Sequence, residues 1–411
     1  MKLLFIGGHH TSAIAVIEAL VEKQGSSLKD FSWIGHKYSM WGDKNPGAEY
    51  CEITALGIPF YDLKAGKLYR TFHPLKLVRI PFGFLQAFYF LLKIKPDLIV
   101  SFGGYLAVPV VMAGWLRQIP VVTCEQTVVS GWANRVVARF ARKIFVAWEQ
   151  SEKFFPKSKV AVTGLPLRRE ILEPISPPLA SDLGQFLKAA ERVKKPIIYI
   201  TGGKQGSHTI NQAVAGVLEE LLRNYSVIHQ CGSSSVFNDY KNLKAEQRSH
   251  YFKKGEDPSD SEGTKPIQQF APKARTERNR VPPRELGVGI YLVQEYFSAA
   301  EVGAIFKACD LVVSRSGAHT IYELAALGKP ALLVPIPWVS HNEQERNARI
   351  LTDLGAAKLL PQKELTSESL LVQLKEMMDN LESYQVAAQQ ARKLVKLDAA
   401  ERIAKGILNE L

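Results

Sequence analysis

Short apolar runs alternate with glycine turns and amphipathic segments along most of the chain. One such unit begins with an apolar run at 309–313, passes through small residues at 314–320 and enters a helical pattern. That pattern places one helix face on Ile321, Leu324, Ala325 and Leu327. Gly328 suits a left-handed C-terminal cap and Pro330 cannot continue a helix, so we expect the helix to end there.

The same unit recurs in the first half of the chain, which predicts an α/β fold with a doubly wound parallel sheet. Strands are expected at 2–6, 98–101, 119–124, 144–148 and 160–163, and helices at 13–21 and 131–143. A first domain is expected at 1–172. A proline-containing linker, 173–195, follows it and includes a polar helix.

The second half repeats the pattern and predicts a second domain at 196–390, followed by a C-terminal helix at 391–411. Strands are expected at 196–200, 225–230, 287–295 and 331–335, and helices at 210–223 and 302–308. Residues 241–287 are rich in Lys, Glu, Ser and Pro and lack apolar periodicity. We expect most of that segment to be a flexible insertion.

The composition of the chain indicates which kinds of partner and which redox compartment to expect. The 411 residues carry a formal net charge of +12, which favours anionic partners such as acidic lipid or phosphorylated substrates. The four cysteines are far apart and form no CxxC pair, which favours a reducing compartment over a zinc site or disulfide framework. The N-terminal apolar run is short and ends in Gly-Gly-His-His, unlike a signal peptide.

Residues 63–96 form a basic, aromatic segment without an acidic residue. Its apolar run at 80–92 is too short to span a bilayer. A helix of this kind commonly lies in a membrane interface; the alternative is a partly buried helix with snorkelling lysines. Nucleic acid is not an expected partner, because no nucleic-acid fold signature accompanies the segment.

Three predicted turns lead from a strand into a helix N-terminus, where free N–H groups and the helix dipole favour phosphate. They lie at 7–12, 201–207 and 314–320. Glu323 follows the third turn, where a carboxylate can bind a sugar diol, although an ordinary βα unit explains the same stretch. His9 or His10 is a candidate general base, or else a solvated or capping group. The first turn lacks a full GxGxxG pattern and the chain has no DxD motif, so neither a cofactor nor a metal is expected.

Six stretches together resemble the MurG-like UDP-N-acetylglucosamine transferases of glycosyltransferase family 28. They are PDLIVSFGGYLAVPVV, CEQTVVSGWANRVVARFA, VTGLPLR, TGGKQGSHTIN, ACDLVVSRSGAHTIYELAALGKPALLVPIP and HNEQERNARIL. They occur in the family's order and cover most of the chain outside 241–287. The resemblance implies a GT-B fold, in which two Rossmann-like domains face a cleft, with the acceptor lipid on the N-terminal half and the donor on the C-terminal half.

The activity implied by the resemblance is an inverting, metal-independent transfer of GlcNAc from UDP-GlcNAc to a polyprenyl-diphosphate-linked MurNAc-peptide in peptidoglycan synthesis. The enzyme would be peripheral on the cytoplasmic face of the cell membrane and contact its anionic surface through 63–96. The alternatives are a UDP-sugar transferase for another lipid acceptor, a UDP-GlcNAc 2-epimerase-like enzyme and a membrane-bound nucleotide-sugar sensor without activity.

The resemblance also implies roles for individual residues. His9 would be the base, with Glu125 as a second catalytic candidate on the acceptor side. The acceptor-binding residues would be Gly7, Gly8, Gly104, Tyr105, Thr127 and Asn134. The donor-binding residues would be Arg168, Lys204, Gly206, Gly317, Ala318, His319, Thr320, Glu323 and Gln344.

The chain departs from the family pattern at several of these places. The first glycine turn is shortened to Gly-Gly-His-His. Single-residue departures are Cys124 for His, Thr127 for Asn, Lys204 for Ser, His319 for a small hydroxyl residue and Glu343 for Gln. They fall on both the acceptor and the donor side of the expected site.

Overall fold

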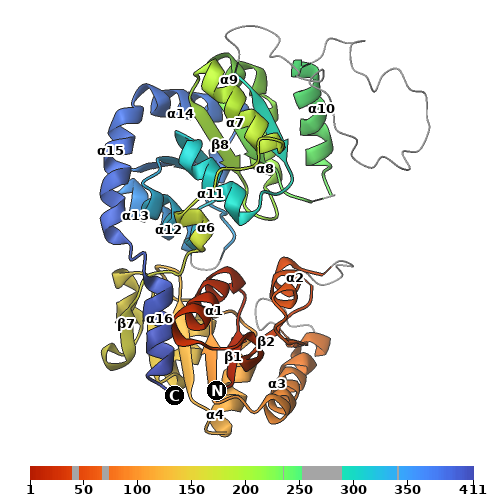
Figure 1. Cartoon of the computed structure of the whole chain (residues 1–411), viewed down its shortest axis with the longest axis vertical. Helices are drawn as coiled ribbons and strands as arrows, with labels where there is room; N and C mark the ends of the chain where they lie inside the picture. The colour runs from red at the N-terminus through yellow and green to blue at the C-terminus, as the bar shows by residue number, and fades with distance from the viewer. Residues whose placement is uncertain (39–45, 67–73, 235, 252–288, 340–341) are drawn as a thin grey trace, which may run out of the picture.

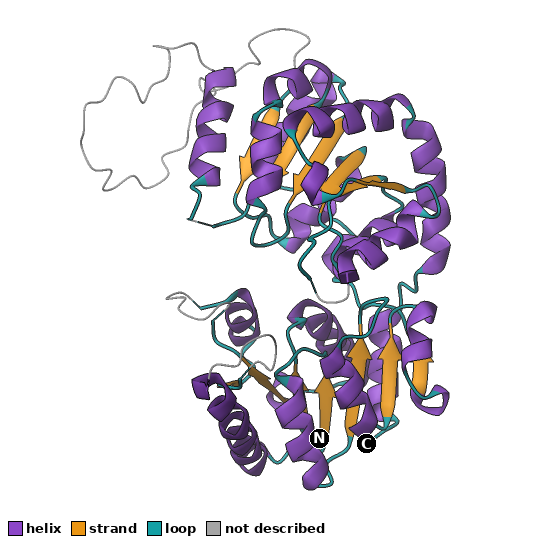
Figure 2. Cartoon of the chain, turned by 180° about the vertical axis from the view of Figure 1, so that it is seen from behind, coloured by secondary structure: helices purple, strands orange, loops and turns teal. Residues whose placement is uncertain are grey.

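The computed structural model describes residues 1–38, 46–66, 74–234, 236–251, 289–339 and 342–411. These residues form two α/β domains stacked along the long axis of the molecule (Figure 1). Helices cover both faces of each sheet (Figure 2). Both chain ends lie in the domain that contains β1 (Figure 1).

Each domain is built on a parallel sheet, so the predicted fold class is confirmed. In order across the first sheet, the strands are β3 (Phe60–Asp62), β2 (Phe31–Gly35), β1 (Leu3–Ile6), β4 (Leu98–Ser101), β5 (Val121–Glu125), β6 (Lys143–Val146) and β7 (Val160–Val162). The second sheet consists of β10 (Tyr291–Gln294), β9 (Ser226–Gln230), β8 (Ile197–Thr201), β11 (Leu311–Ser314), β12 (Ala331–Leu333) and β13 (Ala357–Leu359).

The helices that cover these sheets follow the strands in the sequence. In the first domain they are α1 (His10–Gln24), α2 (Ala48–Ala55), α3 (Pro74–Ile94), α4 (Ala107–Leu116) and α5 (Trp132–Phe140), and α6 (Arg169–Leu172) leads out of it. The second domain contains α7 (Asp182–Val193), α8 (His208–Ala215), α9 (Leu218–Asn224), α10 (Asp239–Tyr251), α11 (Ala299–Ala308), α12 (Ala318–Leu327), α13 (Glu343–Thr352), α14 (Ser367–Asp379) and α15 (Leu381–Ala391). The last helix is α16 (Ala399–Leu408).

The central strands β1, β4 and β11 are almost entirely apolar because both faces of each sheet are buried there. In β1, Leu3 and Phe5 enter one core with residues of α1 and α16. Leu4 and Ile6 enter another core with residues of α3, α4 and α5. Because the side chains of a strand alternate between faces, an unbroken apolar run is what such a doubly covered strand requires.

The chain returns to the first domain at its C-terminus. Lys396 lies between α15 and α16, and its N–H donates to the hydroxyl of Tyr322 in α12 at 2.8 Å. The Lys396 ammonium donates to the carbonyl of Val162 in β7 at 2.8 Å. Helix α16 then packs beside α1 with Ile403 and Ile407 in the first domain's core. The final helix therefore binds one domain to the other.

The structure corrects three predicted elements. The C-terminal helix expected at 391–411 spans only Ala399–Leu408 as α16, because the chain crosses between the domains at Lys396. The helix expected at 210–223 is two helices, because Val217 leaves helical backbone after Gly216, whose missing Cβ would lie 2.3 Å from Ser367 Oγ. The insertion expected at 241–287 begins inside a helix, α10, anchored by buried Leu243 and by a hydrogen bond from Gln247 Nε2 to the Tyr291 carbonyl. Residues 252–288 of that insertion lie outside the described residues.

The domain limits of 172 and 196 stay predictions, but the helix expected between them is well packed. Helix α7 contributes Leu183, Phe186 and Ala190 to a core that also contains Trp148 of the first domain and Tyr322 of the second. This shared apolar core lies where the two domains meet.

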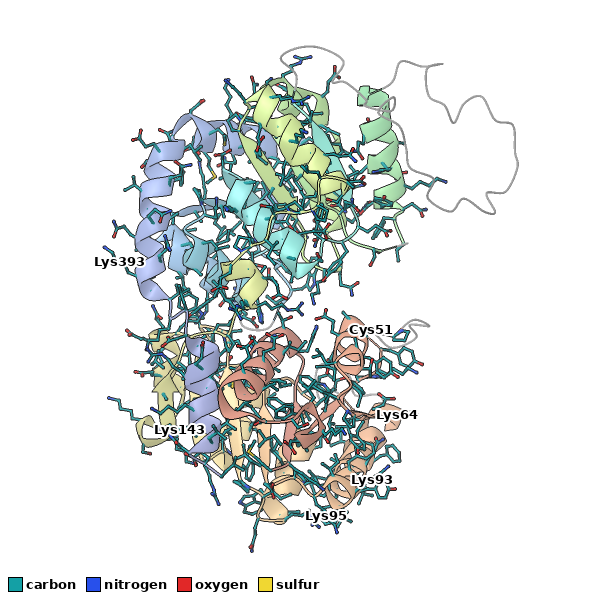
Figure 3. All side chains as sticks on the ribbon, viewed as in Figure 1. Cys51, Lys64, Lys93, Lys95, Lys143 and Lys393 are labelled. Atoms are coloured by element: carbon teal, nitrogen blue, oxygen red, sulfur yellow. The ribbon has the colours of Figure 1, made fainter. Side chains whose placement is uncertain are left out.

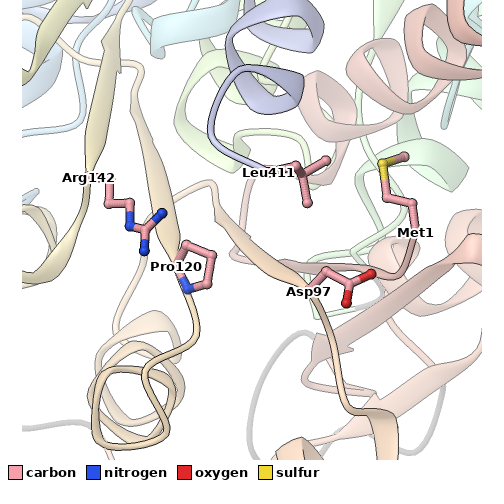
Figure 4. A pocket seen from close by; sticks show the side chains of 5 residues that line it. All are labelled: Met1, Asp97, Pro120, Arg142 and Leu411. Atoms are coloured by element: carbon pink, nitrogen blue, oxygen red, sulfur yellow. The ribbon is translucent and has the colours of Figure 1, made fainter.

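A shallow hollow lies at the amino ends of the first sheet's strands (Figure 4). Its lining residues are Met1, Asp97, Pro120, Arg142 and Leu411. Asp97 is already used there, because it accepts a hydrogen bond from the Lys2 N–H at 2.7 Å. Ligands of open parallel sheets bind at the opposite, carboxyl ends, so we place the candidate site there.

No helix in the described ranges combines the length and the apolar character needed to cross a membrane.

We expect the packing of α16 to stabilise the first domain measurably. Ile403→Ala removes a fully buried side chain and should lower the free energy of unfolding by about 2–5 kcal/mol. Leu397→Ala, at a position that is 51% exposed, should change it by less than about 0.5 kcal/mol. Chemical denaturation of both variants measures the difference, and equal effects would contradict the described packing.

Candidate active site

The carboxyl ends of both sheets point toward the boundary between the domains. Ser12, near the start of α1, contacts His319 in the first turn of α12, with 2.8 Å between Ser12 Oγ and His319 Nε2. The same hydroxyl donates to the Pro166 carbonyl at 3.0 Å. The turn after β1 and the turn after β11 therefore meet directly, as their predicted roles in one site require.

The first-domain turns pack so closely that they require glycine. Gly7 has a φ of +135°, and a Cβ there would lie 2.7 Å from the Gly103 carbonyl oxygen. Gly104 has a φ of +83° and approaches the Gly8 N–H. By contrast, Gly8 is exposed and has open space where a side chain would begin. The β1 and β4 turns thus form one backbone surface, with Gly8 facing outward.

Glu125 is the centre of a hydrogen-bonded cluster at the end of β5. Its Oε1 accepts from the Thr127 N–H at 3.1 Å and from the Thr127 hydroxyl at 2.9 Å. Its Oε2 accepts from Asn134 Nδ2 at 2.9 Å. Asn134 in turn lies against Gly103, where a Cβ would come within 2.6 Å of Asn134 Oδ1. The structure thus brings together three predicted residues and uses both carboxylate oxygens of Glu125 to hold them.

Tyr105 lies in the turn after β4, just before α4 begins. Its side chain is half-buried. Burial raises the pKa of its hydroxyl, and the charge of Glu49 raises it further. The phenol therefore stays protonated at neutral pH.

The turn between β11 and α12 presents the helix N-terminus that the sequence predicts. Gly317 is the N-cap, no side chain caps the helix, and no atom lies within 4 Å of where a Gly317 Cβ would be. Ala318, His319 and Thr320 form the first turn. The Ser316 hydroxyl is buried and has no hydrogen-bond partner among the described residues. A helix N-terminus without a side-chain cap, beside a buried unpaired hydroxyl, has the donors that an anion needs.

Arg315 joins this turn to the turn after β8 and was missed by sequence reasoning. Its guanidinium is buried and donates to the Ser207 hydroxyl at 2.6 Å, to the Thr209 hydroxyl at 3.1 Å and to the Val334 carbonyl at 2.9 Å. Burial lowers its pKa to about 10, so it stays charged at neutral pH. Gly206 completes the β8 turn, where a Cβ would lie 1.9 Å from the Cys231 carbonyl oxygen.

Two histidines face each other across the domain boundary. The ring centroids of His9 and His319 are 6.0 Å apart. Burial, together with the nearby His10, lowers the pKa of His9 to about 4. Burial and the neighbouring histidines and cations lower the pKa of His319 to about 3. Both imidazoles are therefore neutral at pH 7 and keep a nitrogen lone pair.

Beside the histidines, an ionic cluster crosses the same boundary. Glu52 of α2 pairs with Arg168 and with Lys204, whose ammonium donates to Glu52 Oε1 at 2.8 Å. Lys204 Nζ also lies 3.3 Å from His10 Nε2. Sequence reasoning selected Arg168 and Lys204 but missed Glu52. No local motif marks Glu52, because its partners are 116 and 152 positions away in the chain.

The remaining predicted donor residues lie on α12 and α13. Burial raises the pKa of Glu323 to about 7, while the charges of Arg168 and Lys204 oppose that shift. Burial and the charge of Glu125 raise the pKa of Glu343 to about 7. Gln344 accepts a hydrogen bond through Oε1 from the Ile336 N–H at 3.0 Å, which leaves its amide nitrogen for other contacts.

Asn347, which the sequence offers with Glu343 and Gln344 as a group able to hydrogen-bond a sugar, instead links the two domains. Its Oδ1 accepts from the Val128 N–H of the first domain at 3.3 Å. Its Nδ2 donates to the Ser316 carbonyl of the second domain at 3.4 Å. Across the described ranges, no group of three or more His, Cys, Asp or Glu residues is placed to hold a metal ion.

Two Rossmann-like parallel sheets that meet at their carboxyl ends define a GT-B fold, the class implied by the sequence. The structure has a TM-score of 0.65 with the crystal structure of Acinetobacter baumannii MurG, over 100% of both chains at 24% identity. The TM-score with a Neisseria meningitidis UDP-GlcNAc 2-epimerase bound to UDP-GlcNAc is 0.59, over 100% of both chains at 16% identity.

Comparison with known sequences identifies the family within the GT-B class. The profile of the glycosyltransferase family 28 N-terminal domain matches residues 6–146, and that of the family's C-terminal domain matches 266–405. The chain is 33% identical over 395 residues, 94% of each chain, to UDP-N-acetylglucosamine--N-acetylmuramyl-(pentapeptide) pyrophosphoryl-undecaprenol N-acetylglucosamine transferase 2 of Bacillus thuringiensis subsp. konkukian. The chain belongs to glycosyltransferase family 28.

We expect Glu323 to make stability depend on pH. A carboxyl whose pKa is higher in the folded chain than in the unfolded chain favours folding while protonated, and this contribution is lost as pH rises from about 4.5 through about 7. Glu323→Gln should therefore gain stability relative to the wild type by about 1.4 kcal/mol per pH unit across that interval.

Denaturation of both proteins at several pH values measures the gain. Glu345→Gln is the control on α13, where the Glu345 side chain is 43% exposed and pairs with the neighbouring Arg349. A stability difference for Glu323→Gln that does not change with pH would contradict a buried, protonated carboxyl at this position.

Proposed function

We propose that this protein transfers GlcNAc from UDP-GlcNAc to an N-acetylmuramyl-pentapeptide carried on polyprenyl diphosphate. The observation that carries the proposal is the close approach of His9 in the first domain to His319 in the second, with 6.0 Å between ring centroids. An acceptor hydroxyl bound at the turn after β1 would lie close to a donor sugar bound at the turn after β11. Family membership and relatives that match over 94% of the chain support the same reaction.

The donor half of the site would bind UDP-GlcNAc through the turns after β8 and β11. The N-terminus of α12, with Gly317 as its N-cap, offers unpaired N–H groups to the diphosphate. Arg168 and Lys204 add positive charge beside it, which stabilises the departing UDP without a metal ion. Glu323 would accept hydrogen bonds from the ribose hydroxyls, and Gln344 would contact the hydroxyls of GlcNAc.

The acceptor half would use the joined glycine turns of β1 and β4 for the lipid's diphosphate. Gly8 is exposed there and leaves room for an approaching phosphate. Tyr105, Thr127 and Asn134 would line the sugar, and Glu125 would fix the positions of Thr127 and Asn134 through its hydrogen bonds. His9, neutral because its pKa is lowered to about 4, would take the proton from the attacking hydroxyl.

The direct experiment supplies labelled UDP-GlcNAc and the lipid acceptor to the purified protein. The proposal requires a disaccharide lipid and release of UDP. Hydrolysis of UDP-GlcNAc without a lipid product would contradict it. Formation of UDP-N-acetylmannosamine would instead favour an epimerase, the second activity found on this fold, and a different sugar donor or lipid would identify another transferase.

Two substitutions should separate binding from chemistry. Glu323→Ala should raise KM for UDP-GlcNAc about tenfold with a smaller effect on kcat, because a ribose contact is equal in ground and transition states. His9→Ala should lower kcat by about 100-fold or more, because proton transfer is lost. Steady-state kinetics measures both, with Glu345→Ala as the control. A His9→Ala enzyme with nearly normal kcat would remove His9 from the catalytic role.

We further propose that the first domain rests on an anionic membrane surface. Exposed apolar side chains recur along α3 at helical spacing, at Phe82, Leu85, Tyr89 and Leu92. The adjacent α4 exposes Met112, Trp115 and Leu116. Exposed Lys64, Lys93 and Lys95 lie on the same flank of this domain (Figure 3). Apolar side chains beside lysines match the acyl–headgroup boundary. Of the basic segment predicted at 63–96, residues 67–73 lie outside the described residues.

Flotation with anionic vesicles should measure this contact. A variant with Phe82, Leu85 and Tyr89 changed to Ser should bind at least about tenfold more weakly, because three exposed apolar contacts are lost. The matched control changes Leu179, Val372 and Val386 to Ser. These side chains are also exposed, but Leu179 lies before α7, Val372 in α14 and Val386 in α15. Equal loss in both variants would contradict a docking face on α3.

A further inference from the structure

Glu52 holds two cations that the proposed function assigns to the donor diphosphate. Lys204 Nζ donates to Glu52 Oε1 at 2.8 Å, and the Arg168 guanidinium donates to Glu52 Oε2. His10 Nε2 lies 3.5 Å from Oε1. Both carboxylate oxygens are thus engaged by groups that would otherwise be free to bind a phosphate.

The contact joins segments that come from different parts of the molecule. Glu52 belongs to α2 of the first domain, and its neighbour Cys51 lies at the edge of that domain facing the second (Figure 3). Lys204 belongs to the turn after β8 of the second domain, and Arg168 immediately precedes α6. An anion that withdrew Lys204 and Arg168 from Glu52 would therefore also loosen α2 from the second domain.

The environment favours the ionised form of Glu52. Burial by itself raises the pKa of this carboxyl, but hydrogen bonds with His10 and Lys204 and the charges of Lys204 and Arg168 outweigh burial and lower the pKa. The side chains of Glu52 and Arg168 are only 25% and 16% exposed, so solvent screens their attraction less than it would at the surface. Glu52 therefore competes as a full negative charge.

We propose that Glu52 is an internal competitor for the donor diphosphate: its carboxylate occupies Arg168 and Lys204 in the ligand-free protein and must be displaced when a nucleoside diphosphate binds. This inference rests on the proposed donor site. A diphosphate carries more negative charge than one carboxylate and has more acceptor oxygens, so it can replace Glu52 on both cations. The apparent affinity for the diphosphate then equals the intrinsic affinity multiplied by the fraction of molecules in which the cations are free.

If Glu52 competes with the diphosphate, removing its charge should tighten the binding of phosphate-containing ligands only. If the cations are free in about one molecule in ten, Glu52→Gln should tighten UDP binding about tenfold. Uridine, which carries no phosphate, should bind the variant and the wild type equally. Glu52→Ala should behave like Glu52→Gln. The matched control is Glu22→Gln, because Glu22 is an exposed carboxylate of the same domain that approaches Arg169 rather than Arg168 or Lys204.

Titration calorimetry with UDP and with uridine tests the inference on the full chain. Thermal unfolding without ligand establishes that each variant is folded. Unchanged or weaker UDP binding in both folded Glu52 variants overturns the inference, as does an equal gain for uridine or for Glu22→Gln. The lipid transfer assay on the wild type is independent. If the Glu52 variants bind UDP more tightly but the wild type transfers no sugar to lipid, the role of Glu52 stands and the transferase activity is overturned. If the wild type transfers sugar but the Glu52 variants bind UDP like the wild type, the activity stands and the role of Glu52 is overturned.

Discussion

The burial of both faces of both parallel sheets is the constraint on which the site depends. Once helices cover the faces, the carboxyl ends of the strands are where backbone N–H groups remain open to a ligand. The turns after β1 and β4 belong to one domain, and those after β8 and β11 to the other. The shared core around Trp148 and Tyr322, together with the return of α16 to the first domain, holds these four turns against one another.

Charge at this boundary is set by the partners of each group as much as by its burial. Glu323 and Glu52 are both carboxyls close to Arg168 and Lys204, yet burial raises the pKa of Glu323 to about 7, whereas direct contacts lower that of Glu52. Burial leaves His9 neutral because it lowers the pKa to about 4, whereas Arg315 stays charged because burial lowers its pKa only to about 10. Neutral imidazoles and charged cations thus coexist at one boundary, which is the combination that the proposed sugar transfer needs.

Local patterns in the sequence predicted the parallel sheets, β4 at 98–101 and the cap at Gly328, because each depends on neighbouring residues. Gly328 has a φ of +63° and ends α12 as expected. The break at Gly216 depends on contact with Ser367 of a distant helix, and α10 has only a narrow apolar side, so neither shows in local periodicity. Glu52 and Arg315 were missed for the same reason, since their contacts come from distant parts of the chain. Motif resemblance located the other site residues, and their assigned roles stay predictions.

Two departures from the family pattern, the shortened first turn and His319, lie in contact in the structure. The shortened first turn lets α1 begin at His10, which brings Ser12 to the boundary within the helix's first turn. His319, at a position where the family has a small hydroxyl residue, is long enough to reach Ser12 Oγ at 2.8 Å. A shorter side chain at 319 would leave that hydroxyl with the Pro166 carbonyl as its contact. The imidazole at 319 therefore keeps the first turns of α1 and α12 in direct contact across the domain boundary.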